Sequence, residues 1–267
     1  MLSYKMIEGK MDTMQRIAKF LSRAGIASRR DAEKLVQQGS VNVNGLVLHD
    51  LATKVLYTDR IEVNGILVNA VDRTRLWRYH KPTGLVTSNS DEKGRSTIYD
   101  KLPKNLPRVM SIGRLDINSE GLLLLTNDGE LKRHLELPSM EFERKYRVRV
   151  NGTQNERNLD KLRLGMVIDG ENFRPMRITL DKVKGSNVWY NVVLKEGRNR
   201  EIRRAFFQIK MRVNRLIRIS FGDFQLGLLS KGKIVEVPVE ELMKNAKLDI
   251  SNKNYSPYLQ KQLTQKD

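Results

Sequence analysis

The chain has 267 residues, 39% of them hydrophobic and 30% charged, a balance typical of a water-soluble protein with one large or two smaller domains. It contains no cysteine, which excludes disulfides, thiol nucleophiles and cysteine-ligated metal sites and fits a reducing cytoplasm. The formal net charge is +18, more than solubility requires, so we expect a polyanionic partner such as nucleic acid.

Signals for membranes, secretion, metals and nucleotide cofactors are weak throughout. No apolar run approaches the roughly 20 residues that a bilayer requires, and residues 1–20 contain no apolar signal-peptide core, so we expect neither feature. Translation can begin at Met11 or Met14 as well as at Met1. The three histidines have no i, i+4 pair, and no phosphate-binding glycine pattern occurs, so we expect no metal and no nucleotide cofactor.

Residues 14–72 are predicted to form a small first domain, preceded by a flexible segment over 1–13. A first helix ends at Gly25, because four apolar residues before it recur at helical spacing: Ile17, Phe20, Leu21 and Ala24. Ser28 is placed to cap a second helix that ends at Gly39. Strands follow, and the pairs Asn44-Gly45 and Asn64-Gly65 each predict a hairpin turn.

Basic residues gather at the beginning of this first domain and predict an RNA-binding face, with a merely solvated helix face as the alternative. They are Arg16, Lys19, Arg23, Arg29 and Arg30. The stretch "RIAKFLSRAGIASRRDAEKLVQQGSVNVNG" resembles the S4 RNA-binding domain, including the "SRR" that opens the second helix. The resemblance therefore favours RNA as the partner of this face.

Residues 73–245 are predicted to form a larger second domain after a linker near 70–76. Strand-like alternation occurs at 145–152, 189–197 and 215–224, and 198–211 is predicted to be a helix with one apolar side: Ile202, Ala205, Phe206 and Ile209. Because strands and helices mix without a regular βαβ rhythm, the fold class is predicted to be α+β. Residues 246–267 are polar and expected to be disordered.

One acidic residue, Asp116, lies two positions after Arg114 and shortly before the apolar run 122–125. Its ordinary role is that of a turn residue, and the pattern alone slightly favours that role. The alternative is a nucleophile or base kept ionised by arginines from the basic stretch 195–218. Tyr146 likewise has two interpretations, core packing and stacking on a nucleobase.

The segment "GRLDINSEGLLLLTNDG" resembles the signature of pseudouridine synthases of the RsuA/RluB family, which act on ribosomal RNA. Flanking pieces agree with it in order and spacing, among them "HKPTGLVTS", "DEKGRST", "RKYRVRV" and "EGRNREIRRAF". An S4 domain in front of the catalytic domain is also the arrangement of this family. The resemblance covers about residues 14–240 and is nearest to the RluB branch, the synthases of large-subunit RNA.

The resemblance implies a catalytic domain on a mixed, largely antiparallel sheet with flanking helices, which converts uridine into its C-glycoside isomer without cofactor or metal. It also implies roles for particular residues. Asp116 is the essential acid, either as nucleophile or as base in a glycal route, and Tyr146 stacks on the target base. Arg203 pairs with the acid, Ile202 packs against the base, and Arg114 fills the RNA stack. Further substrate contacts are expected from Lys145, Arg200 and Arg204.

Two positions depart from the family pattern: Ser119 replaces a usual threonine, and Glu201 replaces a frequent glutamine and is expected to face outward. The implied substrate is ribosomal RNA, with 23S rRNA of the large subunit favoured, acted on by a cytoplasmic monomer. The alternatives are 16S rRNA, transfer RNA, or a non-catalytic protein that binds ribosomal RNA during assembly. No membrane partner is expected.

Overall fold

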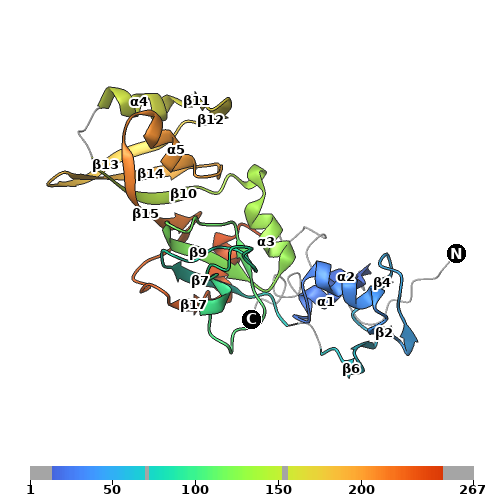
Figure 1. The fold of residues 1–267 in the computed structure, drawn as a ribbon. Helices are drawn as coiled ribbons and strands as arrows, with labels where there is room; N and C mark the ends of the chain where they lie inside the picture. Colours follow the sequence, from blue (N-terminus) through green and yellow to red (C-terminus); the bar gives the residue numbers. More distant parts are fainter. Residues whose placement is uncertain (1–13, 70–71, 152–155, 249–267) are drawn as a thin grey trace.

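The computed structural model describes residues 14–69, 72–151 and 156–248, which form a small N-terminal unit and a larger domain (Figure 1). The expected flexible segment 1–13, and the expected tail beyond residue 248, lie outside the described residues. Of that tail, Ala246 is buried and Leu248 packs on the core of the larger domain. The described part of the chain has no helix long and apolar enough to cross a membrane.

The N-terminal unit contains two helices, α1 (Ile17–Arg23) and α2 (Arg29–Gln37), beside a sheet of order β3-β2-β5-β6. The strand bounds are β2 (Val41–Val43), β3 (Leu46–Val47), β5 (Ile61–Val63) and β6 (Ile66–Leu67), and β1 (Gln15–Arg16) pairs separately with β4 (Lys54–Val55). As predicted, the Ser28 hydroxyl accepts a hydrogen bond from the Asp31 N–H, and Asn44 and Asn64 adopt the positive φ of hairpin turns.

The larger domain is built on one nine-stranded sheet with the path β13-β14-β10-β15-β9-β7-β17. β8 and β16 are added at β9 and β15, and every pairing except β9 with β15 is antiparallel, which confirms the predicted α+β class and mixed sheet. The bounds are β7 (Leu76–Lys81), β8 (Met110–Ile112), β9 (Glu120–Thr126), β10 (Arg144–Asn151), β13 (Arg177–Lys184), β14 (Asn187–Leu194), β15 (Arg212–Phe221), β16 (Phe224–Gln225) and β17 (Ile234–Glu236).

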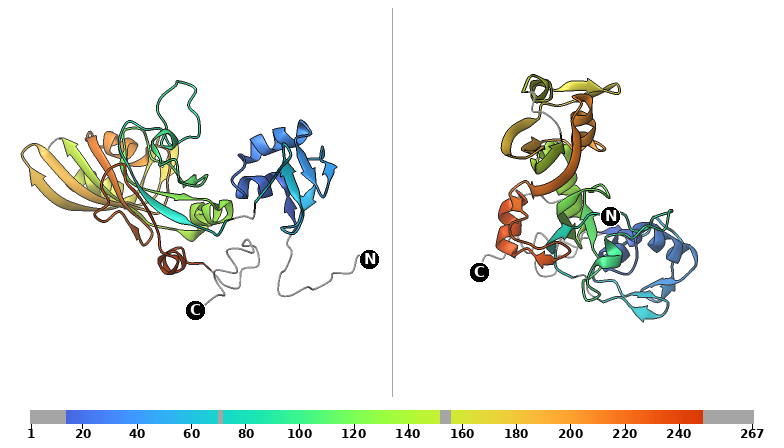
Figure 2. Two further views of the ribbon diagram at one scale, coloured as in Figure 1. Left: turned by 90° about the horizontal axis from the view of Figure 1, so that it is seen from below. Right: turned by 60° about the vertical axis from the view of Figure 1, so that its left-hand side comes forward.

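Four helices flank this sheet: α3 (Gly129–Glu136), α4 (Glu156–Leu164), α5 (Glu201–Gln208) and α6 (Val239–Asn245). Short 3-10 turns occur at Tyr99–Lys101 and Pro138–Met140, and β11 (Met166–Ile168) pairs with β12 (Glu171–Phe173). As predicted, α5 buries Ile202, Ala205 and Phe206 on one side, against the strands β10, β14 and β15. In Figure 2 the N-terminal unit lies beside α3.

Strand β9 is buried along its whole length, and its two faces contribute to different cores. Leu122 and Leu124 pack with α3 and α6, whereas Leu123 and Leu125 pack with the segment 85–115 on the other face. Gly121, at the beginning of the strand, lies so near β15 that a Cβ atom would be 2.3 Å from the Arg218 carbonyl oxygen. The apolar run 122–125 is therefore a central strand, and its glycine permits the parallel pairing with β15.

A buried polar cluster joins the N-terminal unit to the larger domain. Arg23, 8% exposed, lies 3.5 Å from the Asp128 carboxylate and donates to the carbonyl oxygens of Asn127 and Asp72 and to the Thr74 hydroxyl. Asp128 also caps α3 through its other carboxylate oxygen. Thr74 is buried as well, so the end of the stretch 70–76 that was expected to be a linker packs into the larger domain.

Glu201 is buried, which makes the expectation that it faces outward wrong. It is the first residue of α5, and its side chain turns back to accept a hydrogen bond from the Arg198 N–H at 3.0 Å. Burial, with the neighbouring Glu196 as a smaller cause, raises the pKa of the Glu201 carboxyl to about 8. The physical reason for the inward position is this bond to the loop that precedes α5, because the Arg198 N–H needs an acceptor.

We predict that replacing Arg23 with methionine lowers the free energy of unfolding by about 3 kcal/mol, because Asp128 then remains a buried charge without its partner. Urea denaturation followed by circular dichroism measures the loss. Arg29→Met, which removes an exposed arginine from α2, serves as the control and should change stability little. Equal stabilities of the two variants would contradict a structural role for Arg23.

We also predict that Glu201→Gln changes how stability depends on pH. The folded pKa of Glu201 lies above its unfolded value, so wild-type stability is full below about pH 4.5 and falls as pH rises toward 8. Glutamine does not titrate, so the variant should gain on the order of 1–3 kcal/mol relative to wild type between pH 5 and pH 8. Urea denaturation at each pH measures this difference, and parallel curves would refute it.

Candidate active site

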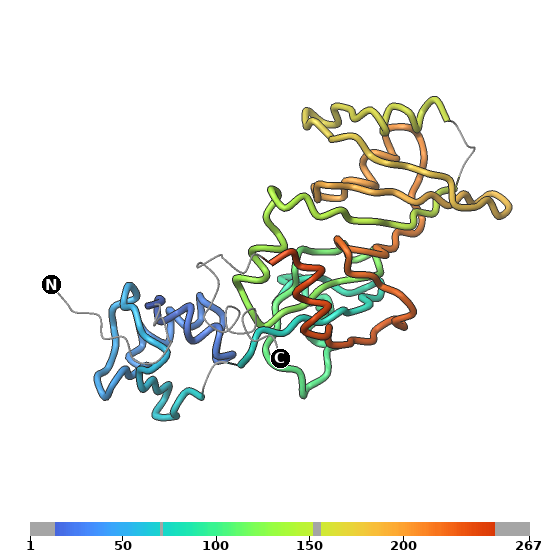
Figure 3. Tube along the Cα trace, turned by 180° about the vertical axis from the view of Figure 1, so that it is seen from behind, coloured from blue at the N-terminus to red at the C-terminus, as the bar shows by residue number. Residues whose placement is uncertain are grey.

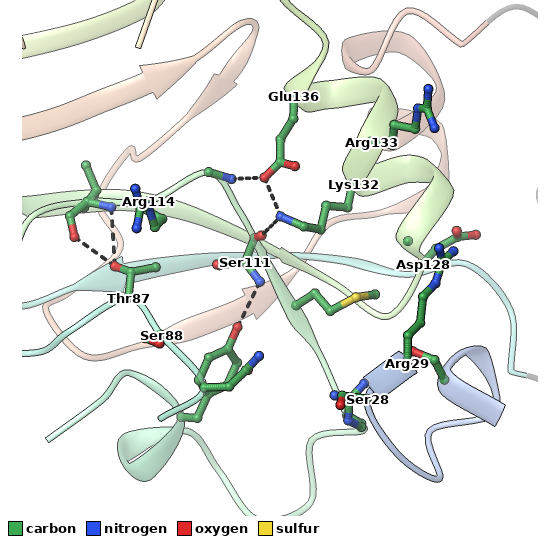
Figure 4. Close-up of a pocket in the computed structure, with 18 of the residues that line it drawn as sticks. Ser28, Arg29, Thr87, Ser88, Ser111, Arg114, Asp128, Lys132, Arg133 and Glu136 are labelled. Carbon is green, nitrogen blue, oxygen red and sulfur yellow. Dashed lines mark hydrogen bonds and ion pairs between the residues drawn. The ribbon is translucent and has the colours of Figure 1, made fainter. Parts of the chain in front are cut away.

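Two adjoining hollows of the structure share part of their lining. The larger is a cleft of about 1730 Å³ between the N-terminal unit and the larger domain, and the smaller is a cavity of about 250 Å³. In Figure 4, Ser28 and Arg29 of the N-terminal unit line the cleft opposite Thr87 and Arg114. Arg114 and Asp116 line both hollows, so this acid lies where the cleft leads into the cavity.

The loop that carries Asp116 is held in place by hydrogen bonds from a buried lysine. Lys81, with 0% of its surface exposed, donates from Nζ to the carbonyl oxygens of Asp116 at 3.1 Å and Ser119 at 3.0 Å. A third bond goes to Pro82, and the Ser119 N–H closes the turn onto the Asp116 carbonyl oxygen. Burial lowers the pKa of Lys81 to about 8. The lysine fixes the backbone of the loop and leaves the carboxylate free.

Two guanidinium groups flank the Asp116 carboxylate. Arg200 Nη1 lies 3.7 Å and Arg203 Nε lies 3.9 Å from its Oδ2 atom. These are ionic contacts beyond hydrogen-bond length, since the terminal nitrogens of Arg203 donate instead to the carbonyl oxygens of Val213 and Asn118. The expected partner Arg203 therefore lies beside the acid without a direct hydrogen bond to it. Because those donors tie β15 to the Asp116 loop, the carboxylate oxygens remain available to a substrate.

Arg200 reaches this position through an unusual backbone conformation. It is the N-cap of α5 and has a φ of +48°, in the left-handed region that favours glycine. Such strain costs on the order of 1 kcal/mol and persists where the surrounding structure imposes it. Here it turns the chain from the loop 195–199 into α5 and directs the guanidinium toward Asp116.

The cavity that Asp116 lines also has both apolar and charged side chains in its lining. Tyr146 and Ile202 line it together with Leu194, Leu216 and Phe221. Tyr146 packs against two hydrophobic cores at once, which fixes its ring at the boundary between them. The polar groups of the cavity include Arg144, Arg218 and Glu201. The cavity therefore combines a flat aromatic wall with polar groups that can bind the edge of a planar ring.

Sequence reasoning missed the buried polar residues Lys81 and Arg218, and the partly exposed Arg144 that lines the cavity. Arg218 is 3% exposed and donates from Nε to the Leu122 carbonyl oxygen at 2.7 Å, which links β15 to β9. A signal was available, because Leu216, Arg218 and Ser220 alternate along one strand and all three are buried. A charged residue on the inward face of a strand indicates either a structural clamp or a site.

The structure brings most of the predicted catalytic-domain residues together around the acid: Asp116, Arg114, Tyr146, Arg200, Ile202 and Arg203. Two others lie apart from the hollows. Arg204 pairs with Asp169 and Glu171, and its guanidinium lies over the Phe173 ring. Lys145 precedes Tyr146 on β10 and lines neither hollow.

The five basic residues predicted in the first domain divide into two groups. Arg16, Arg29 and Arg30 are exposed, and Arg29 lines the cleft. Lys19 pairs with Glu130 of α3, and Arg23 is buried in the cluster with Asp128. The described part of the chain contains no group of three histidine or carboxylate side chains placed to hold a metal ion.

Comparison with known proteins supports this interpretation of the fold. The RNA pseudouridylate synthase family matches residues 75–208, and the S4 domain family matches residues 15–61. An uncharacterised RNA pseudouridine synthase of Rickettsia felis is 49% identical over 224 residues, covering 84% of this chain and 97% of that protein. The ribosomal large subunit pseudouridine synthase B of Yersinia pestis is 40% identical over 219 residues, covering 79% of this chain and 69% of that protein.

A solved structure described as a pseudouridylate synthase has a TM-score of 0.59 and 26% identity, and the match covers 86% of this chain and 99% of that one. Sequence families, relatives and fold thus agree on one assignment. The chain belongs to the RNA pseudouridylate synthase family, and it is an isomerase with an S4 domain in front of its catalytic domain.

Proposed function

We propose that this synthase isomerises a uridine of ribosomal RNA, in 23S rRNA of the large subunit, and that Asp116 is its essential catalytic residue. The observation that carries the catalytic assignment is the position of Asp116, an acid between two arginines where the wide cleft meets the small cavity. The 40% identity with the large-subunit synthase of Yersinia pestis favours the large-subunit substrate.

The cleft and the cavity suit two parts of one substrate. The cleft has room for a segment of RNA, whereas the cavity, at about 250 Å³, suits a single base. A uridine in a helix must leave the stack to enter it, at a cost of about a few kcal/mol. Arg114 is exposed and lines both hollows. We therefore assign to it the role of filling the gap that the flipped nucleotide leaves in the RNA stack.

The reaction breaks the bond between base N1 and ribose C1′ and joins base C5 to C1′, so the base turns without leaving the cavity. Asp116 acts on the ribose, as a nucleophile at C1′ or as a base in a glycal route, and both need an ionised carboxylate. Arg200 and Arg203 place two positive charges 3.7 and 3.9 Å from this carboxylate. Lys81 keeps the carboxylate in position, because it binds the backbone carbonyl oxygens of the loop that carries it.

The apolar walls hold the base while it turns. We assign to Tyr146 stacking on the uracil ring and help in removing the C5 proton after the new bond forms, since it lines the cavity beside Asp116. Ile202 lines the same cavity, and its apolar side chain lets the ring rotate because it forms no hydrogen bond with it. A detached uracil that is held by packing alone can present C5 in place of N1.

The S4 domain supplies affinity for the RNA around the target. Arg29 lines the cleft, and Arg16 and Arg30 are exposed on the same unit, so these side chains are available to phosphates. The buried cluster of Arg23 and Asp128 fixes this unit against α3. It thereby sets the distance between the basic side chains of the unit and Asp116. RNA contacts at the S4 domain therefore position the target uridine at the acid.

We predict that Asp116→Asn lowers turnover by at least about 1,000-fold and leaves RNA affinity nearly unchanged, because the amide keeps the shape but provides neither charge nor nucleophile. Carbodiimide primer extension on ribosomal RNA from cells lacking the protein, complemented with wild type or variant, measures the modification. One stop in 23S rRNA that wild type alone restores would support both parts of the proposal.

Two other outcomes of this mapping are informative. A restored stop in 16S rRNA or in transfer RNA would keep the enzyme and replace its substrate. If Asp116→Asn restores the stop as well as wild type does, the assigned role of Asp116 is lost. A filter-binding assay on the same preparations checks that the variant still binds RNA.

We further predict that Arg29→Ala with Arg30→Ala weakens RNA binding and reduces its salt slope by about 1–2, because each phosphate contact contributes about 0.9 to the slope. Lys54→Ala with Arg60→Ala is a matched control, since it removes two exposed cations that lie on the same unit but do not line the cleft. Titrations at several KCl concentrations measure the slopes. Equal slopes for the two variants would place the S4 contact elsewhere.

A further inference from the structure

The half of the sheet formed by β13, β14, β10 and β15 has two unlike faces. One packs against α4 and α5 through the hydrophobic core that contains Val148, Tyr190 and Val192, and Figure 1 shows both helices on the same side. Trp189 is on the other face, and it belongs to none of the hydrophobic cores formed by the described residues. Its ring is covered instead by arginine side chains.

The strand register places cations in rows across this second face. Trp189 is opposite both Lys182 and Arg149, and Arg149 is in turn opposite Arg215, so one row crosses all four strands. The next row consists of Lys184, Asn187, Asn151 and Arg212. We call this surface the basic face, with the members Arg147, Arg149, Lys182, Lys184, Arg212 and Arg215.

Three guanidinium groups surround Trp189, those of Arg147 at 4.8 Å and of Arg149 and Arg215 at 5.7 Å from the ring centroid. The indole is only 8% exposed as a result. It therefore serves as a platform that holds the cations in place, and it has no free surface for stacking on a base. A ligand of this face meets charged nitrogen atoms and not an aromatic ring.

Few carboxylates balance the basic face. Asp181 pairs with Arg147, and Glu120 pairs with Arg215. Among the described residues, no carboxylate lies within ion-pair distance of the other four members: Arg149, Lys182, Lys184 and Arg212. Arg149 and Arg215 are also directly opposite each other, an arrangement of like charges that lowers the stability of a sheet. The unbalanced positive charge indicates that this face binds an anionic partner.

A solubilising surface looks different on this same protein. On α4, which covers the opposite face of these strands, Arg163 contacts both Glu156 and Asp160, so the two signs of charge alternate. Mixed signs are sufficient for solubility. The basic face lacks this mixing, which separates it from an ordinary solvated surface.

We propose that the basic face binds the phosphate backbone of a second segment of RNA, distinct from the segment that carries the target uridine. The proposal rests on the proposed ribosomal RNA substrate. Tyr146 packs on the face opposite to Arg147 and Arg149, because neighbouring residues of a strand alternate between faces. The RNA in the catalytic cleft therefore does not cover the basic face.

The geometry of the face favours backbone contact over base readout. Four strands spaced about 4.8 Å apart give a row about 14 Å wide, wide enough for cations to meet successive phosphates. Because Trp189 is covered, sequence-dependent stacking is not available. The β13–β14 hairpin also lies at the end of the molecule opposite the N-terminal unit (Figure 3). The basic face thus extends the RNA contact to a large folded RNA.

The first test removes two unpaired cations from the face, with Lys182→Gln and Arg212→Gln combined. Binding to purified 23S rRNA is titrated at several KCl concentrations. We expect affinity on the order of 10-fold lower at 100 mM KCl and a salt slope reduced by about 1–2, with kcat unchanged at saturating RNA. The matched control is Arg157→Gln with Lys161→Gln, which removes one arginine and one lysine, both exposed, from α4 on the opposite side.

Equal losses in the two double variants would overturn the proposal, because general charge would then explain the affinity. Thermal unfolding checks that each variant is folded, and the single change Lys182→Glu against Lys161→Glu repeats the comparison at exposed positions should a double variant not fold. A separate assay tests whether the proposed catalytic function itself fails. Tritium release from 5-labelled uridine in wild type reports catalysis, whereas the binding comparison needs no turnover.

A second test locates the RNA directly. The chain has no cysteine, so Lys184→Cys carries a single attachment point for an iron–EDTA cleavage reagent on the basic face. We expect cuts in 23S rRNA at nucleotides away from the modified uridine, and no such cuts with the reagent at Lys161→Cys on α4. Absence of cleavage from position 184 would overturn the proposal.

Discussion

The site depends on one buried interaction, the bonds from the Lys81 ammonium to the backbone carbonyl oxygens of the Asp116 loop. Lys81 is the last residue of β7, which pairs with β9, so the lysine is carried by the same central strands that the loop leads into. Burying an ammonium is unfavourable unless its donors are satisfied, and here three carbonyl oxygens satisfy them. The position of the acid is therefore set by strand pairing and not by its own side chain.

Strand β9 connects this interaction to the rest of the site. Both of its faces are buried, and Gly121 lets it approach β15, which carries Arg218. Arg218 in turn bonds the Leu122 carbonyl oxygen, and Arg203 bonds Val213 and Asn118, so α5, β15 and the Asp116 loop are tied across the parallel contact. The charged groups near Asp116 thus also hold the sheet together where it changes from antiparallel to parallel pairing.

The sequence predicted the parts of this arrangement that depend on local pattern. The capping by Ser28 and the apolar side of α5 both follow from spacing over a few residues. Lys81 and Arg23 were not recognised as buried, because a charged residue is buried only when distant segments supply its partners, here residues 116–119 and 127–128. Glu201 was misplaced for a related reason, since its burial follows from a bond to its own preceding loop.

The two faces of the sheet show how a chain with a net charge of +18 can fold stably. On the catalytic side, the charges that flank Asp116 are neutralised by that carboxylate or by backbone carbonyl oxygens. On the basic face, the guanidinium groups of Arg147, Arg149 and Arg215 are held over Trp189, which packs their alkyl stems, and Asp181 and Glu120 pair with two of them. Among the described residues, the charge of the other four members of the face remains unbalanced. A protein tolerates that repulsion when the ligand that removes it is abundant. With the proposed ribosomal RNA substrate, the enzyme meets such a ligand at every encounter, because a large RNA presents phosphates on every side of the target.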